Sequence, residues 1–181
     1  MIKETTDKLE SLYNKYNSLM YSTAFRILND HQLAQDAVQM AFVKIIRNTK
    51  IINEIECNKT KALMVIICRN ISIDLYNKRK HNNPIIIEEM NEIPDYTFSI
   101  DEQMIKHESL TELKEKIRLL YQPYADIISL RYFYDYSDSE IAKILDISEQ
   151  NARVRLHRAK NSLIDLIKAD EENGGVRLYE D

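Results

Sequence analysis

The residue types best suited to recognition chemistry lie close together near the C-terminal end of the chain. Between positions 149 and 160 a single acid, Glu149, stands against four basic residues: Arg153, Arg155, Arg158 and Lys160. Arginine presents a fork of donors that fits guanine edges and phosphates. The cluster therefore favours nucleic-acid binding, and the alternative is an ordinary solvated helix face.

A helical repeat sorts this segment into two faces. At about 100° per residue, one stripe is apolar and consists of Ala152, Leu156, Ala159 and Leu163. The opposite face and its flanks carry side chains that suit base edges and phosphates: Gln150, Asn151, Arg153, Val154, Arg155, His157, Arg158 and Asn161. We expect the apolar stripe to pack on Ile127, Ile128, Leu130, Ile141 and Ile144. His157 has no second metal ligand three or four residues away, so we expect no metal site here.

The element before this segment completes a DNA-binding motif. Ser137 with Glu140 three residues later is a capping-box signature, so a short helix begins there and ends near Leu145. The connector 146–148 then leads into the longer basic helix, which we expect to end near Lys168. A short helix, a three-residue connector and a basic helix predict a helix-turn-helix.

A second basic cluster closes the N-terminal half of the chain. Between positions 69 and 80 a single acid, Asp74, stands against four basic residues: Arg69, Lys78, Arg79 and Lys80. A solvated helix face is again the alternative to nucleic-acid binding. Asn70 and Asp74 lie one helical turn apart, so they could also form a buried, hydrogen-bonded pair.

Apolar residues at spacings of three and four predict helices along most of the chain. Besides the helix-turn-helix, the predicted helices cover 6–29, 31–48, 60–80, 101–120 and 123–134. A loop is expected over 49–59. The β-branched run Val65-Ile66-Ile67 would also suit a strand, although the segment's length and charged flanks favour a helix. On the second helix we place an inner face at Val38, Ala41, Phe42, Ile45 and Ile46.

Composition excludes several classes of function. The only glycines, Gly174 and Gly175, lie in the tail, so neither a glycine-rich phosphate loop nor a dinucleotide fingerprint can form. Cys57 and Cys68 have no cysteine or histidine partner nearby, so we expect reduced thiols, no zinc site and no cofactor. The N-terminus is polar and there is no long apolar run. We therefore expect a cytoplasmic protein without a signal peptide or membrane span.

The net charge of −4 is unevenly distributed along the chain. Residues 1–80 carry 13 Lys and Arg against 8 Asp and Glu, whereas residues 81–117 carry 3 against 9. The acidic stretch contains Pro84 and Pro94, which favours a linker. We predict an all-α protein with two small helical domains joined by an extended linker, the second domain carrying the helix-turn-helix. The predicted divisions are 1–80, an acidic linker over 81–105, 106–169 and a disordered tail over 170–181.

Three segments, in this order, resemble the motifs of a known family. They are LAQDAVQMAFVKIIR (33–47), ICRNISIDLYNKRK (67–80) and YSDSEIAKILDISEQNARVRLHRAKNSL (136–163). The chain resembles bacterial sigma factors, in particular the small two-domain extracytoplasmic-function group, over roughly residues 9–168. It departs from the family pattern where that pattern often has Trp, Arg, Val and Ser, which are here Leu63, Asn77, Ala152 and Val154.

The resemblance implies binding rather than catalysis. It implies that the second helix binds the clamp helices of core RNA polymerase through Asp36, Gln39, Met40 and Val43. It implies that the loop 49–59 and the third helix hold a flipped base and the strand of the minus-10 element through Asn58, Arg69, Asn70, Asn77, Lys78, Arg79 and Lys80. The recognition helix then reads the minus-35 element through Gln150, Asn151, Arg153, Val154, Arg155, His157 and Arg158.

Further partners follow from the same resemblance: the polymerase flap, promoter DNA and an anti-sigma factor. The acidic linker, with Glu88, Glu89 and Glu92, would run through the RNA exit path of the polymerase. The alternative function is a stand-alone helix-turn-helix regulator, which would have no use for the segment 33–47. An enzyme is a third possibility, but no constellation of catalytic residues is discernible.

Overall fold

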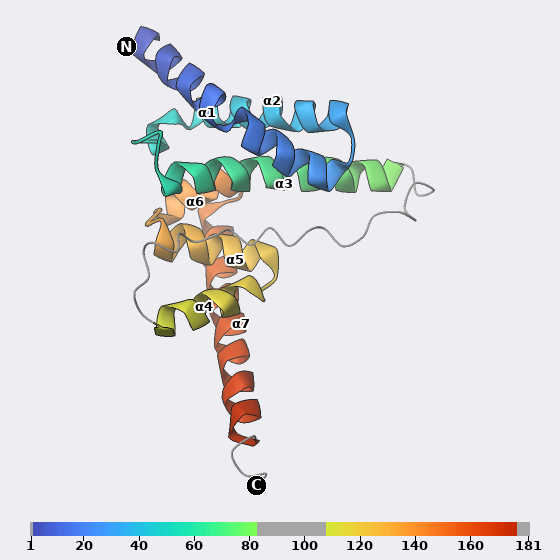
Figure 1. The fold of residues 1–181 in the computed structure, drawn as a ribbon. Coiled ribbons are helices and arrows are strands. Elements are labelled where there is room, and N and C mark those ends of the chain that lie inside the picture. Colours follow the sequence, from blue (N-terminus) through green and yellow to red (C-terminus); the bar gives the residue numbers. More distant parts are fainter. Residues whose placement is uncertain (1, 83–107, 177–181) are drawn as a thin grey trace. The chain divides into compact units, whose positions relative to one another are not determined.

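The computed structural model describes residues 2–82 and 108–176, and every regular element within these ranges is helical (Figure 1). The chain divides into two compact units, Met1–Tyr96 and Thr97–Asp181. The predicted all-α fold with two helical domains is confirmed. Residues 83–105 of the predicted linker and 177–181 of the predicted tail lie outside the described residues.

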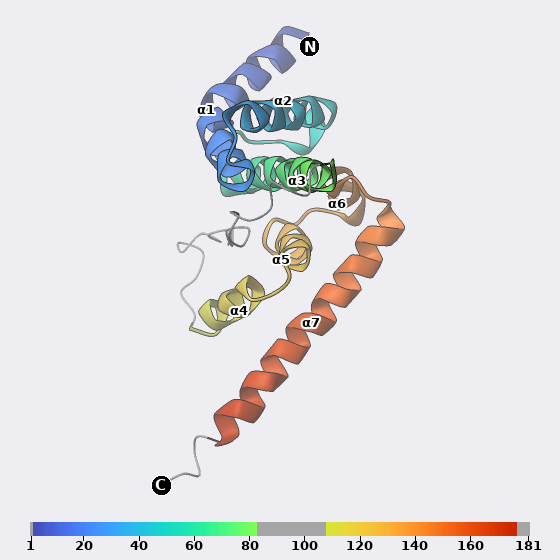
Figure 2. The same cartoon turned by 90° about the vertical axis from the view of Figure 1, so that its right-hand side faces the viewer.

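In its described residues unit 1 contains three α-helices, α1 (Ile2–Leu28), α2 (His31–Arg47) and α3 (Asn58–Asn82), and each packs on the other two (Figures 1 and 2). A short 3-10 helix, Thr49–Ile51, follows α2. The turn between α1 and α2 is tight because Asn29 adopts a left-handed conformation (φ 46°), which asparagine tolerates better than most residues. Asp30 then caps α2 by accepting a hydrogen bond from the N–H of Leu33 at 3.0 Å.

The core of unit 1 lies between the apolar faces of these helices. Its fully buried side chains include Leu12, Met20, Ile27, Ile45, Met64 and Ile66. The run Val65-Ile66-Ile67 is buried inside α3, so the helical prediction is confirmed over the strand alternative. The placement of Ile46 on the inner face of α2 is wrong. Ile46 is 50% exposed because it lies at the edge of the buried face, unlike Ile45 beside it.

Unit 2 contains α4 (Glu108–Arg118), α5 (Gln122–Ile128), α6 (Asp138–Leu145) and α7 (Glu149–Val176). Each of the other three helices packs against α7, the longest described helix of this unit (Figure 2). A short π-helix, Ser129–Phe133, follows α5 and replaces the last turn of the predicted helix 123–134. The N–H of Tyr134 donates to the carbonyl oxygen of Ser129, five residues earlier, at 3.1 Å, which is the hydrogen-bond spacing of a π-helix.

The predicted helix-turn-helix is formed by α6 and α7. Ser137 and Glu140 make both bonds of the capping box, the N–H of Ser137 donating to Glu140 Oε2 at 2.8 Å. The helix ends where Asp146 adopts a left-handed conformation (φ 58°), a position usually taken by glycine. The residues expected to support α7 are all buried: Ile127, Ile128, Leu130, Ile141 and Ile144. The last helix continues to Val176, past its predicted end near Lys168.

The described helices contain neither a membrane-spanning segment nor a metal centre. None of those in residues 2–82 and 108–176 has the length and apolarity that crossing a bilayer requires. Nor do the side chains described there gather three His, Cys, Asp or Glu groups that could hold a metal ion.

Candidate nucleic-acid interface

The face of α7 opposite its buried stripe is open to solvent. Val154, near the centre of this face, is 41% exposed, whereas Ala152 and Ala159 on the other side are 2% and 0% exposed. Arg155 is half-buried on the flank, and the remaining predicted recognition residues are exposed: Gln150, Asn151, Arg153, His157 and Arg158. The structure therefore presents the predicted recognition set together on the first turns of one accessible helix.

Two basic side chains of α7 interact with neighbouring side chains of unit 2. Arg153 pairs with Asp138 of α6 at 3.3 Å and with Glu149 at 3.4 Å. Lys160 Nζ lies 5.2 Å from the ring centre of Tyr132. Two other arginines form no ion pair with any residue that the structure describes, and these are Arg155 and Arg158. They can reach a phosphate or a base edge without breaking an internal ion pair.

The second half of α3 presents only part of the predicted minus-10 set. Its exposed members are Asn77, Lys78 and Lys80. Arg79 pairs with Asp30, the cap of α2, at 3.6 Å. Arg69 is 1% exposed, so its side chain does not lie on the surface of the chain. Asp74 is exposed and Asn70 is half-buried, so the buried pair that the sequence also allowed is not formed.

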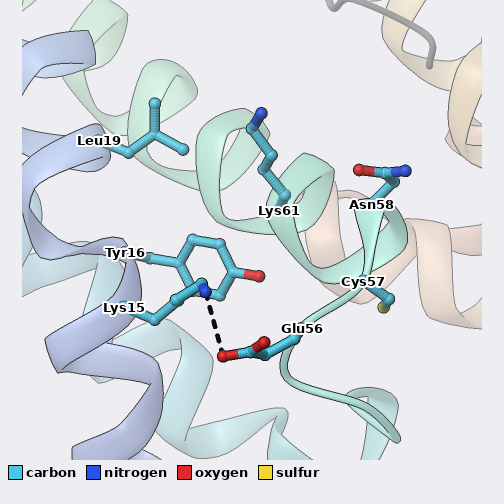
Figure 3. A pocket seen from close by; sticks show the side chains of 7 residues that line it. All are labelled: Lys15, Tyr16, Leu19, Glu56, Cys57, Asn58 and Lys61. Atoms are coloured by element: carbon cyan, nitrogen blue, oxygen red, sulfur yellow. Dashed lines mark hydrogen bonds and ion pairs between the residues drawn. The ribbon is translucent and has the colours of Figure 1, made fainter. Parts of the chain in front are cut away.

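A pocket lies where α1 meets the loop that precedes α3 (Figure 3). Its volume is about 400 Å³, and it is lined by Lys15, Tyr16, Leu19, Glu56, Cys57, Asn58 and Lys61. Small-molecule sites in proteins have volumes of this order, so the pocket has room for one nucleobase. Asn58 was predicted from the sequence, but Lys15, Tyr16 and Lys61 were not. Tyr16 comes 39 positions before the loop residue that it contacts, and no local pattern signals such a pairing.

Tyr16 joins α1 to this loop. Its side chain is 5% exposed, and its hydroxyl donates to the carbonyl oxygen of Ile55 at 2.5 Å. Burial, followed by the nearby charges of Cys57 and Glu56, raises the pKa of Tyr16 above its ordinary value of 10.0. The hydroxyl is therefore a neutral hydrogen-bond donor at physiological pH.

The two cysteines are free thiols in different surroundings. Cys57 is half-buried in the pocket wall, and its Sγ accepts a hydrogen bond from the N–H of Thr60 at 3.4 Å, at the start of α3. Cys68 is buried, and its thiol donates to the carbonyl oxygen of Met20 at 3.2 Å. Burial raises the pKa of Cys68 to about 12. The two thiols should therefore differ sharply in reactivity.

A thiol-specific reagent at about pH 8 is expected to label one cysteine per native chain. The thiolate is the reactive form, and Cys68, with a pKa of about 12, has almost none of it at that pH. We expect label on Cys57 in the native protein and on Cys68 only after denaturation, as read by peptide mass spectrometry. Cys57→Ser provides the control, because it should abolish native labelling. Rapid labelling of Cys68 in the native chain would contradict the packing around α3.

The outward face of α2 combines exposed apolar and polar side chains. Met40 and Val43 are 46% and 48% exposed. Gln39 beside them is exposed, and Asp36 one turn earlier is half-buried. All four predicted polymerase-binding residues therefore share one face of α2, and Ile46 extends its apolar part. Apolar side chains grouped on an accessible face in this way are typical of a surface that a partner covers.

Unit 2 has a concave surface between the α4–α5 connection and the later turns of α7. Its volume is about 380 Å³, and it is lined by Leu119, Leu120, Tyr121, Tyr124, Ser162, Asp165 and Leu166. Leu119 and Tyr121 are 69% and 70% exposed. None of the lining residues belongs to the recognition set, so unit 2 offers two separate surfaces.

Two known family models match this chain. The one described as Sigma-70 region 2 matches residues 12–82, and the one described as Sigma-70, region 4 matches residues 110–163. The first range covers most of α1 and all of α2 and α3, and the second runs from α4 into α7. Together they span about two thirds of the chain.

Individual relatives match over both units. RNA polymerase sigma factor SigZ of Bacillus subtilis (strain 168) is 24% identical over 160 residues, which are 88% of this chain and 87% of that protein. ECF RNA polymerase sigma factor SigX of the same strain is 22% identical, over 95% of this chain and 91% of that protein. Among solved structures, the sigma factor RpoE in complex with the anti-sigma factor NepR from Bartonella quintana matches 94% of this chain and 99% of that one. Its TM-score is 0.40 at 22% identity.

Proposed function

Because the chain belongs to the sigma-70 family, in its extracytoplasmic-function group, we propose that it selects promoters for core RNA polymerase. It binds the polymerase, directs it to promoters through their minus-35 and minus-10 elements, and helps to open the DNA. This function is binding, so no residue of the chain needs to carry out covalent chemistry.

The observation that carries the proposal is the accessible polar face of α7 within a complete helix-turn-helix. Its central side chains offer an amide at Gln150 for adenine and a methyl group at Val154 for thymine. Arg158 offers a fork for guanine, and Arg155 on the flank suits a phosphate. We therefore assign the minus-35 element to this face.

We assign the minus-10 element to the pocket beside α1 and to the end of α3. A flipped base needs an enclosing site with hydrogen-bonding groups, and a single strand needs cations along its backbone. Asn58 supplies the amide group, and Lys61 supplies a cation at the pocket. Lys78 and Lys80 continue the basic surface along α3. Arg69 is left out of this surface because it is buried.

Two separate surfaces suit the polymerase. The outward face of α2 would meet the clamp helices, with Met40 and Val43 as apolar contacts and Asp36 as a polar contact at its rim. The apolar pocket of unit 2 beside Leu119 and Tyr121 suits the flap. Two contacts on one chain act together, so the complex can be tight even where each contact is weak.

An anti-sigma factor and a cytoplasmic location complete the proposal. The exposed apolar face of α2 is a surface that an inhibitor could cover in place of the polymerase. Bacterial promoters and polymerase are cytoplasmic, and so this chain would act there. A stand-alone regulator is the less favoured function, because it would use neither this face nor the pocket beside α1.

Transcription with defined components tests the proposal. Core RNA polymerase is supplied with fragmented genomic DNA, with and without the chain, and RNA start sites are mapped. We expect new discrete start sites only when the chain is present, and a shared sequence upstream of them. An absence of new starts, together with an absence of co-elution with core polymerase, would contradict the proposal and favour the stand-alone regulator.

A further inference from the structure

Side chains on one face of α1 hold the loop that connects α2 to α3. Lys8 and Tyr16 are eight residues apart, so about two helical turns place them along the same face. Lys8 Nζ donates to the carbonyl oxygens of Thr49, at 3.3 Å, and of Ile52. These are charge-assisted bonds to the backbone, so they restrain the course of the loop itself.

Tyr16 links the pocket to the same loop. It lines the pocket, as Figure 3 shows. Its hydroxyl also donates to the Ile55 carbonyl oxygen at 2.5 Å. Without this hydroxyl the carbonyl would lose its donor in a partly buried place, which is costly. Lys15 pairs with Glu56 at 3.1 Å, but their side chains are 49% and 74% exposed, so this pair contributes little.

The other end of the loop is fixed by the first turn of α3. Thr60 is 2% exposed, and its hydroxyl donates to the Glu54 carbonyl at 2.5 Å. The Sγ of Cys57 accepts the Thr60 N–H, as described above. The loop that walls the pocket is therefore held from two sides, and α1 is one of them.

We propose that α1 shapes the minus-10 pocket, with Tyr16 and Lys8 as positioning residues that set the loop before the DNA strand arrives. This inference rests on the proposed function, because it concerns the site assigned to the flipped base. A pocket formed in advance does not need to order its loop when the base enters. More of the binding free energy is then available to hold the base out of the stack.

Tyr16→Phe tests this role, because it removes one hydroxyl and keeps the ring. The assay uses the full chain bound to core polymerase and promoter DNA opened in advance over the minus-10 segment. Each non-template base of that segment is replaced in turn by an abasic site. For the unaltered chain, the abasic site at the captured base should weaken binding about tenfold. For Tyr16→Phe we expect this ratio to fall to about twofold, with minus-35 binding unchanged.

Three further variants separate positioning from folding. Lys8→Met is expected to behave like Tyr16→Phe, and Lys8→Arg to restore the ratio because it keeps a cationic donor. Tyr21→Phe is the matched control, since it removes a hydroxyl of α1 that bonds instead to His31 at 2.5 Å. Tyr21→Phe should keep the ratio of the unaltered chain.

Each contrary outcome has a separate meaning. An unchanged ratio in Tyr16→Phe and Lys8→Met would overturn the inference and leave the proposed function intact. An equal loss at every position, minus-35 binding included, would show that these residues only support the fold, which also overturns it. If the unaltered chain selects no start sites and responds to no abasic position, the proposed function fails and this inference fails with it.

Discussion

Replacing Val43 with aspartate is expected to abolish transcription by the reconstituted holoenzyme while unit 1 stays folded. Val43 is 48% exposed, so in the free protein the new carboxylate meets water and the helical core is untouched. Against the polymerase, the same carboxylate would lose its water at an apolar contact and stay unpaired. A central interface contact is worth about 2–4 kcal/mol, or roughly 30- to 1,000-fold in affinity.

Affinity for core polymerase is the direct measurement, made by fluorescence anisotropy of the labelled chain, with circular dichroism to verify folding. Asn14→Asp is the control, because it adds the same charge at an exposed position of α1. We expect that variant to transcribe normally. If Val43→Asp binds core polymerase within about threefold of the unaltered chain, the outward face of α2 is not the docking surface.

The helix-turn-helix could be predicted because its signals are local. The capping box joins Ser137 to Glu140, three residues later, and the connector is three residues long. Helical hydrogen bonds also join residues that are close in the sequence. The 3.6-residue period then divides α7 into two faces. Ala152 and Ala159 were placed on the inner face and are buried, so the side chains on the other face could be identified from the same repeat.

Features set by distant parts of the chain could not be predicted in this way. Arg69 has the sequence surroundings of a surface cation, yet it is 1% exposed. Ile46 has the spacing of a core residue, yet it lies at the edge of the buried face. Tyr16 lines the pocket next to its contact with Ile55, which lies 39 positions later in the sequence. The helical repeat predicts the direction in which a side chain points from its own helix. It does not predict which other segment of the chain packs against that side.

Arg158→Ala is expected to relax base preference at one position of the minus-35 element. Arg158 is exposed on the recognition face of α7 and forms no ion pair with the described residues, so its fork can bind a guanine edge directly. The variant should lose about 1–3 kcal/mol, or roughly 5- to 150-fold, on the preferred promoter. On a promoter in which that base pair is already changed, the variant should lose little affinity relative to the unaltered chain. A library randomised over the element, selected with holoenzyme, measures this preference.

Arg155→Ala is the matched comparison, because Arg155 is half-buried on the flank of α7, where we expect its fork to bind a phosphate rather than a base edge. We expect it to weaken binding to all promoters alike and to lower the salt slope of binding by about one, with base preference unchanged.

Both variants must be measured in holoenzyme, because the chain's net charge of −4 opposes tight binding of DNA by the chain alone. If neither variant alters base preference or salt slope, the face of α7 does not read the minus-35 element. If both alter base preference, Arg155 enters the groove as well, and the boundary between readout and phosphate contact lies further round the helix.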